Sequence, residues 1–208
     1  MLELKNVSLT FNSDGRDQTV LQNLSYTFET GRITAITGVS GIGKTTILNL
    51  AAGLLRASEG SVINTFEKTA YVFQESRLLP WKTALENVTC VCGDEAKARK
   101  YLDMLLPGES DKYPDELSGG MQQRVAIARA MAYEADLVLL DEAFKGLDEK
   151  TKSEVIEILK EHLKGRTAIM ITHDKSELSL CDTVLEVNAT PISELCEIAV
   201  KSGKQKSE

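Results

Sequence analysis

A loop that could bind phosphate groups is the clearest chemical feature of this 208-residue sequence. The residues GVSGIGKT follow an apolar run, Ile33–Thr37, and lead into a helical pattern, which is the context that such a loop requires. Its glycines let backbone N–H groups close around phosphate oxygens, and the start of the helix adds partial positive charge. The residues expected to bind nucleotide phosphates are Gly38, Val39, Ser40, Gly41, Ile42, Gly43, Lys44, Thr45 and Thr46.

Four residues of this sequence have the chemistry needed to act on a bound phosphate. Lys44 would reach the β- and γ-phosphates, and the Thr45 hydroxyl would ligate Mg²⁺. Asp141 and Glu142 follow another apolar run, so that the first carboxylate could hold Mg²⁺ and the second could polarise an attacking water. Considered alone, the two acids could equally cap the next helix. The phosphate loop favours the functional interpretation.

Two further apolar runs end in polar residues. Thr69–Phe73 ends at Gln74, and Thr167–Thr172 ends at His173. Runs of this kind interleaved with helices indicate a parallel sheet that is covered on both faces. Because ligands of such sheets bind beyond the carboxyl ends of the strands, Gln74 and His173 are predicted to meet the phosphate loop and the two acids at one site. Taken singly, each could be a structural polar residue at a strand end.

The elements around these residues can be predicted from periodicity. Residues 1–28 alternate apolar and polar side chains, and the turn-rich link Ser13–Gln18 makes them a predicted antiparallel hairpin. Helices are expected over residues 44–54 and 149–163, with Asp148 as the N-cap of the second. The apolar stripe of the first is formed by Ile47, Leu48, Ala51 and Leu54. On the basic face of the second, His162 is expected to be exposed to solvent.

The segment between Glu75 and Leu117 lacks strand signals and is predicted to be a helical insert, with a capping box at Thr83–Glu86. The sequence LSGGMQQR follows, and its Ser118, Gly119 and Gly120 precede a further helix. Backbone donors at a helix start can bind an anion, so one chain would have one phosphate loop but two anion-binding places. On its own, the SGG sequence would be an ordinary N-cap with flexible glycines.

Taken in order, these motifs resemble the ATP-binding cassette (ABC) family, the ATPase subunits of ABC transporters. The resemblance spans roughly residues 1–187 and is carried by GVSGIGKT, Gln74, LSGGMQQR, LVLLDE, FKGLD and His173. It implies an α/β fold of the P-loop NTPase class, with a mostly parallel core sheet, an N-terminal antiparallel β subdomain and an inserted helical subdomain. The single domain would comprise core residues 1–74 and 118–187, an insert of residues 75–117 and a tail of residues 188–208.

In this family two subunits enclose two ATP molecules, and the resemblance implies roles for particular residues. Ser118–Gly120 of one subunit would contact the γ-phosphate bound by the loop of the other. Glu142 would be the general base, and His173 would contact the γ-phosphate. Phe11 occupies the place of an aromatic residue that stacks on adenine, although core packing is an alternative for it. The implied cofactors are ATP and Mg²⁺, and the residues expected near Mg²⁺ are Thr45, Gln74 and Asp141.

The loop after Glu142 departs from the family pattern P-F-x-A-L-D, since Ala143–Asp148 reads AFKGLD. Asp148 is retained, whereas Lys145 and Gly146 differ. This loop touches the opposite subunit in the family, so dimer coupling is expected to differ in detail.

The stretch Val72–Val88 is similar to the ATPases of nitrate, sulfonate and taurine importers. Its apolar residues Leu78–Trp81 could dock a helix of a membrane subunit or pack within the insert. The resemblance implies a second ATPase subunit, integral membrane permease subunits and, indirectly, a solute-binding protein as partners, at the cytoplasmic face of the membrane. The alternatives are an ABC exporter ATPase and a soluble ABC ATPase that does not act in transport.

The composition argues against several other classes of protein. With 24 Lys and Arg residues against 31 Asp and Glu residues, the net charge of −7 predicts no nucleic-acid partner. The apolar runs are far shorter than the roughly 20 residues of a membrane span. The four cysteines lack zinc-type spacing and are expected to be reduced structural thiols. The polar residues Ser202–Glu208 are expected to be frayed.

Overall fold

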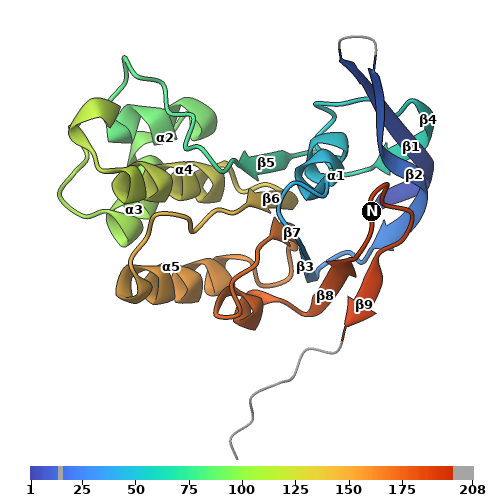
Figure 1. Cartoon of the computed structure of the whole chain (residues 1–208). Coiled ribbons are helices and arrows are strands. Elements are labelled where there is room, and N and C mark those ends of the chain that lie inside the picture. The colour runs from blue at the N-terminus through green and yellow to red at the C-terminus, as the bar shows by residue number, and fades with distance from the viewer. Residues whose placement is uncertain (14–15, 199–208) are drawn as a thin grey trace, which may run out of the picture.

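The computed structural model describes residues 1–13 and 16–198. A six-stranded sheet lies in the middle of the molecule, with a three-stranded antiparallel sheet at one end and a group of helices at the other (Figure 1). The segment Ser202–Glu208 and the middle of the predicted turn Ser13–Gln18 lie outside the described residues.

The antiparallel sheet has the strand order β2-β1-β4. Strands β1 (Leu2–Ser13) and β2 (Arg16–Phe28) form the predicted hairpin, in which Leu2 lies opposite Phe28. Strand β4 (Glu59–Asn64) pairs with the other edge of β1. No strand is predicted there, because the β4 residues are exposed or half-buried and show no clear apolar alternation.

The central sheet has the strand order β5-β6-β7-β3-β8-β9, and neighbouring strands are parallel except at β8 and β9. Strands β6 and β7 are buried along their whole length, as expected for a sheet covered on both faces. The predicted mostly parallel core sheet is therefore confirmed. The strands are β3 (Ile33–Gly38), β5 (Thr69–Val72), β6 (Leu137–Asp141), β7 (Thr167–Ile171), β8 (Thr183–Val187) and β9 (Cys196–Ile198).

The two faces of the central sheet belong to two separate hydrophobic cores, because successive side chains of a strand point to opposite faces. On one face, Ile169 and Ile171 pack with helix α1 (Lys44–Ala51) and the antiparallel sheet. On the other face, Ala168 and Met170 pack with helices α4 (Gly119–Tyr133) and α5 (Glu149–His162). The phosphate loop thus opens into a helix that is held by a core of its own.

The helical insert contains α2 (Ala84–Cys92), α3 (Glu95–Leu105) and a 3₁₀ turn at Pro114–Glu116. The capping box at the start of α2 is present, since the Glu86 amide donates to the Thr83 hydroxyl and the Thr83 amide donates to Glu86. Val88 of α2 and Leu102 of α3 are fully buried against α4. The same core continues to the sheet, so the insert shares its packing with the helices and strands beside it.

Both predicted flanking helices are present, although their ends differ from the prediction. Asp148 caps α5 by accepting hydrogen bonds of 3.1 Å from the amides of Lys150 and Thr151. Helix α1 ends at Ala51 rather than at residue 54, and Leu54 is 57% exposed. The prediction that Leu54 completes the apolar stripe is wrong, because the chain has already left the helix there.

The expectation that His162 is exposed is also wrong. Its ring is half-buried and lies edge-on to Tyr101 of α3, with ring centroids 5.4 Å apart. Its Nε2 atom is buried and has no hydrogen-bond partner among the described residues. The basic neighbours of His162 in the sequence suggested solvent, but the last turn of α5 packs beneath the helical insert. Burial lowers the pKa of His162 to about 4.

This lowered pKa predicts a specific loss of stability in acid. The unfolded chain binds the imidazole proton at a pKa near 6.5, whereas the folded chain binds it only near 4. The contribution of neutral His162 to the free energy of unfolding is therefore complete above pH 6.5 and is lost as the pH falls toward 4. His162→Phe should reduce the pH dependence of the unfolding free energy by about 1 kcal/mol between about pH 7.5 and pH 5, since the ring is only half-buried.

Urea unfolding of the wild-type and variant chains at both pH values measures this difference. Ser153→Ala, at an exposed residue of the same helix that carries no titratable group, is the matched control and should keep the wild-type pH dependence. Equal pH dependence in wild type and His162→Phe would contradict the assignment of the proton to His162.

Candidate functional site

A cleft of about 940 Å³ opens at the carboxyl edge of the central sheet. It is bordered by the segments that follow β3, β5, β6 and β7, which are neighbours in the sheet. The structure therefore brings together residues that are far apart in the sequence. The predicted site residues that line this cleft are Gly38, Val39, Ser40, Gly41, Gly43, Lys44, Thr45, Gln74, Glu142 and His173.

The Lys44 amine lies inside the phosphate loop, where it donates hydrogen bonds of 2.8 Å to the carbonyl oxygens of both Gly38 and Val39. Gly43 precedes α1 with a φ of 112°, a conformation that side chains disfavour. Burial lowers the pKa of Lys44, and the nearby charges of Glu142 and Asp141 oppose that shift. The loop thus combines a cation with the amides of a helix start, which is a suitable arrangement for binding phosphate.

Asp141 is the last residue of β6 and is only 4% exposed. Burial raises the pKa of Asp141 and the charge of Glu142 adds to this, whereas hydrogen bonds from Thr45 and Tyr71 lower it. The Tyr71 hydroxyl lies 3.4 Å from the Asp141 carboxylate. The Thr45 and Asp141 oxygens together are hard donors of the kind that Mg²⁺ prefers.

The described residues include no cluster of three or more His, Cys, Asp and Glu side chains that could hold a metal ion. Mg²⁺ commonly keeps only one or two protein ligands and takes the others from water and substrate phosphates. The oxygen donors of Thr45 and Asp141 beside the phosphate loop therefore fit a magnesium ion that arrives with a nucleotide.

Glu142 is the meeting point of three strand ends. Its backbone has a φ of 45°, which is uncommon for a residue with a side chain, and its amide donates to the carbonyl of Ile171. The Gln74 amide nitrogen donates a 3.0 Å hydrogen bond to Glu142 Oε2. His173 Nδ1 lies 3.8 Å from Glu142 Oε1. A carboxylate held in this way, half-buried at the edge of the cleft, is able to accept a proton from a water.

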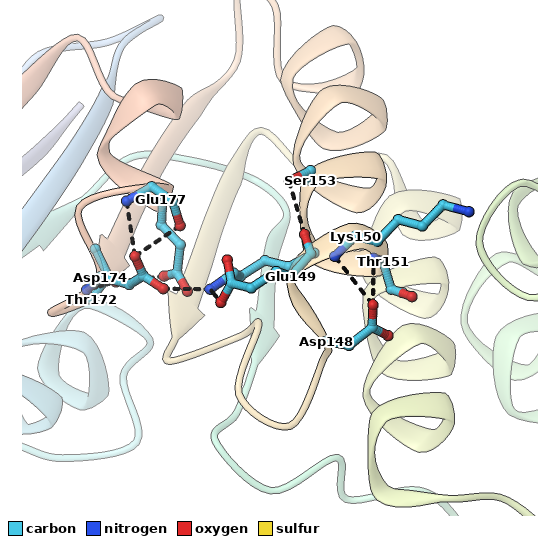
Figure 2. A network of polar contacts seen from close by, with 10 residues as sticks. Asp148, Glu149, Lys150, Thr151, Ser153, Thr172, Asp174 and Glu177 are labelled. Atoms are coloured by element: carbon cyan, nitrogen blue, oxygen red, sulfur yellow. Dashed lines mark hydrogen bonds and ion pairs between the residues drawn. The ribbon is translucent and has the colours of Figure 1, made fainter.

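The segment after β7 fixes the backbone on both sides of His173, whereas its imidazole is 77% exposed. The Asp174 amide donates a 3.0 Å hydrogen bond to the Thr172 hydroxyl, and the Asp174 carboxylate pairs with Lys152 of α5 (Figure 2). Neither Lys152 nor Asp174 is among the predicted site residues, although both line the cleft. The adjacency of Asp174 to His173 and the single helical turn between Asp148 and Lys152 are the sequence signals for them.

Several predicted site residues do not line this cleft. Phe11 lies on β1 and is 39% exposed, so the alternative that it packs in the core is wrong. Ile42 is buried, and Thr46 belongs to the first turn of α1. Asp141 lies behind the cleft, beneath Thr45 and Tyr71.

Ser118, Gly119 and Gly120 also lie outside the cleft, at the start of α4. The Ser118 hydroxyl caps this helix by accepting a hydrogen bond of 3.3 Å from the Met121 amide. Gly120 packs against the loop after Glu142, where a Cβ atom on Gly120 would lie 2.7 Å from the carbonyl oxygen of Gly146. The predicted second anion-binding place is thus separate from the phosphate loop but in contact with the loop that leaves Glu142.

Comparison with known proteins identifies the family. The family model described as ABC transporter matches residues 21–145, more than half of the 208-residue chain. The chain belongs to the ABC transporter family. It is accordingly an ATP-binding and ATP-hydrolysing subunit of an ABC transporter, which confirms the resemblance and the fold class predicted from the sequence.

Individual relatives agree with this assignment. The aliphatic sulfonates import ATP-binding protein SsuB 1 of Rhodococcus jostii is 40% identical over 82% of this chain and 74% of its own length. The putative hemin import ATP-binding protein HrtA of Staphylococcus haemolyticus is 34% identical over 89% of this chain and 96% of its own length. A solved dimeric structure of the ATP-binding cassette MJ0796, bound to ADP and Pi, superposes with a TM-score of 0.87. The two chains are 30% identical, and the superposition covers 95% of this chain and 98% of the MJ0796 chain.

In the described part of the chain, no helix of this ABC ATPase has both the length and the apolar character of a membrane span.

Gly43→Ala tests the geometry of the phosphate loop. A Cβ atom at residue 43 would lie 2.4 Å from the Val20 side chain, and the φ of 112° already disfavours it. We expect the dissociation constant for MgATP to rise by about 5- to 150-fold, since such backbone strain is worth about 1–3 kcal/mol.

Isothermal titration calorimetry measures this change in affinity. Gly53→Ala is the matched control, because Gly53 also has a positive φ of 72° but faces open space away from the cleft. The control should keep the wild-type affinity, and wild-type affinity in Gly43→Ala would contradict the proposed binding mode.

Proposed function

We propose that this ABC ATPase serves an importer, that two copies enclose two MgATP molecules, and that the dimer drives a separate membrane permease. The observation that carries the proposal is that the phosphate loop and the predicted anion-binding place at Ser118–Gly120 are separate in one chain. The phosphate loop lies in the cleft, whereas Ser118–Gly120 lie outside it. A second copy would bring its own Ser118–Gly120 to the phosphates that the first copy holds. The dimeric assembly of the similar cassette bound to ADP and Pi supports this arrangement.

Within this assembly, the predicted site residues have defined tasks. The phosphate loop and Lys44 bind the β- and γ-phosphates. Glu142 accepts a proton from the attacking water, whose oxygen bonds to the γ-phosphorus as the bond to the ADP oxygen breaks. Gln74 and His173, which both approach Glu142, contact the γ-phosphate and orient that water. Phe11 stacks on the adenine ring.

Mg²⁺ would be held by Thr45, Asp141 and Gln74 and would neutralise part of the phosphate charge. The hydrogen bonds that Asp141 receives from Thr45 and Tyr71 hold its carboxylate beside Thr45. A single chain should therefore bind ATP but hydrolyse it slowly until a second chain completes the site.

Glu142→Gln tests the role of the general base. The amide keeps the size and hydrogen bonding of the side chain but cannot accept the proton. We expect unchanged MgATP affinity, accumulation of an ATP-bound dimer, and hydrolysis at least about 100-fold slower than wild type.

Phosphate release and light scattering after gel filtration measure turnover and dimer content. Glu154→Gln changes an exposed acid on α5 in the same way and should leave both unchanged. Turnover at the wild-type rate in Glu142→Gln would remove Glu142 from this role.

We assign the ATP-binding core to residues 1–74 and 118–187 and the helical insert to residues 75–117. Helices α2 and α3 of the insert pack on α4 of the ATP-binding core, so the boundary between the two parts crosses one continuous hydrophobic core. We assign residues 188–208 to the tail. Within its described part, strand β9 pairs with β8, and this pairing supports a structural role for that part of the tail.

The importer assignment rests on the relatives. Several of their names specify import of aliphatic sulfonates, which supports a small sulfonate or a related anion as the transported solute, whereas one is named for hemin import. A solute-binding protein would deliver that solute to the permease, and the ATPase would work at the cytoplasmic face of the membrane.

The surface that would meet the permease includes Pro80 and Trp81. Leu78 packs against the core of the insert, whereas Trp81 is 69% exposed and Pro80 is exposed beside it. Packing within the insert is thus supported for Leu78, and docking to a membrane subunit is supported for Trp81. Exposed tryptophans are frequent energetic centres of protein interfaces.

Trp81→Ala should leave the fold and the MgATP affinity unchanged but weaken association with the permease by at least about tenfold, because truncation of such an anchor costs about 2 kcal/mol or more. Co-purification with the permease, or a pull-down at increasing permease concentrations, measures the loss of association. Met104→Ala, at another exposed apolar residue of the insert, is the control. If Trp81→Ala and Met104→Ala retained the same amount of permease, the docking role of Trp81 would be contradicted.

A further inference from the structure

Lys152 is a buried lysine that the hydrolytic scheme does not use. It lies one turn into α5, and its side chain is only 7% exposed. Its amine pairs with Glu149 at 2.8 Å and with Asp174, which follows β7. Figure 2 shows Glu149 and Asp174 directed toward each other from these two elements. A buried ammonium group is costly without partners, so this pair strongly determines where the segment bearing Asp174 lies.

Asp174 in turn organises the residues around it. One carboxylate oxygen pairs with Lys152, and the other accepts hydrogen bonds of 2.9 and 2.8 Å from the amide and hydroxyl of Ser176. The amide of Asp174 donates to the Thr172 hydroxyl. The hydrogen bond with Lys152, followed by those with Ser176, lowers the pKa of Asp174 to about 2. The ion pair therefore persists throughout the neutral range of pH.

A second anchor holds the other side of His173. Thr172 is buried, and its hydroxyl donates a hydrogen bond to the buried Glu177 carboxylate at the start of the 3₁₀ turn Glu177–Leu180. Both backbone neighbours of His173 are thus fixed, whereas its imidazole projects toward solvent beside Glu142. The direction of that imidazole depends on these two backbone anchors, since among the described residues the one polar contact of the ring is its 3.8 Å approach to Glu142.

Helix α5 is joined to both reacting side chains. Its N-cap, Asp148, ends the six-residue loop that leaves Glu142, and Lys152 lies one turn further along. We propose that Lys152, acting through Asp174, is a positioning residue that sets the His173 imidazole relative to Glu142. The role of His173 itself rests on the proposed function. By this arrangement, a displacement of the loop after Glu142 is transmitted by α5 to the His173 segment.

Lys152→Met tests the positioning role in the full-length chain, because methionine keeps much of the side-chain volume and removes the amine. We expect kcat for ATP hydrolysis to fall by about 10- to 100-fold, the range for a slightly misplaced catalytic group, with KM for ATP changed by less than about twofold. Asp174→Asn should cause a similar loss, and the double variant should lose no more than either single variant. Lys152→Arg, which keeps the cation, should retain most of the activity.

The chain has only two histidines, so the His173 imidazole can be observed directly by proton NMR. Lys152→Met should shift the His173 ring signal and leave the His162 signal in place. Lys160→Met, at an exposed lysine of the same helix, is the matched control and should change neither signal nor kcat.

An unmoved His173 signal, a rise of KM in proportion to the loss of kcat, or additive losses in the double variant would each overturn the inference. Loss of the folded state in both Lys152→Met and Lys152→Arg, seen in thermal unfolding, would show a purely structural residue and overturn it as well. If the wild-type chain failed to hydrolyse ATP, the proposed function would fail, while the NMR comparison would still decide whether Lys152 positions His173.

Discussion

The hydrogen bonds that join buried parallel strands in the order β5-β6-β7-β3 are the constraint on which the site depends. These strands have no solvent to satisfy their backbone groups, so each must run beside its neighbours in a fixed register. Their carboxyl ends therefore meet at one edge, although they come from four distant parts of the chain. Gln74 and His173 can both approach Glu142 because of this shared edge.

The cleft also concentrates groups that are costly to bury. Lys44 and Asp141 are both desolvated, and each is stabilised by neighbours rather than by water. Glu142 adopts a left-handed backbone conformation at the point where the chain leaves β6. Buried charges and an unfavourable backbone conformation are typical of sites whose groups are arranged before a ligand binds. Such a site avoids the free-energy cost of rearranging those groups during the reaction.

The sequence alone was sufficient for the features that depend on local rules. Glycine spacing, apolar runs and the Asp148 cap predicted the loop, the strands and the start of α5, since each follows from nearby residues. Long-range packing decided the rest. The burial of His162 depends on the insert folding over α5, and the pairing of β4 and β9 depends on edges supplied by β1 and β8. The Lys152–Asp174 pair joins a helix to a strand end, so the sequence signals for each residue do not show that the two meet.

The continuous core between the insert and the sheet has a consequence for how such a chain can diverge. Val88 and Leu102 of the insert touch the same apolar core as Met170 of the central sheet, whereas the residues behind the phosphate loop belong to the other core. Changes in the insert must be matched by changes in α4 and on one face of the sheet, but they need not disturb α1. A lineage could therefore exchange the surface that recognises its partner while the opposite side of the sheet keeps its nucleotide chemistry unaltered.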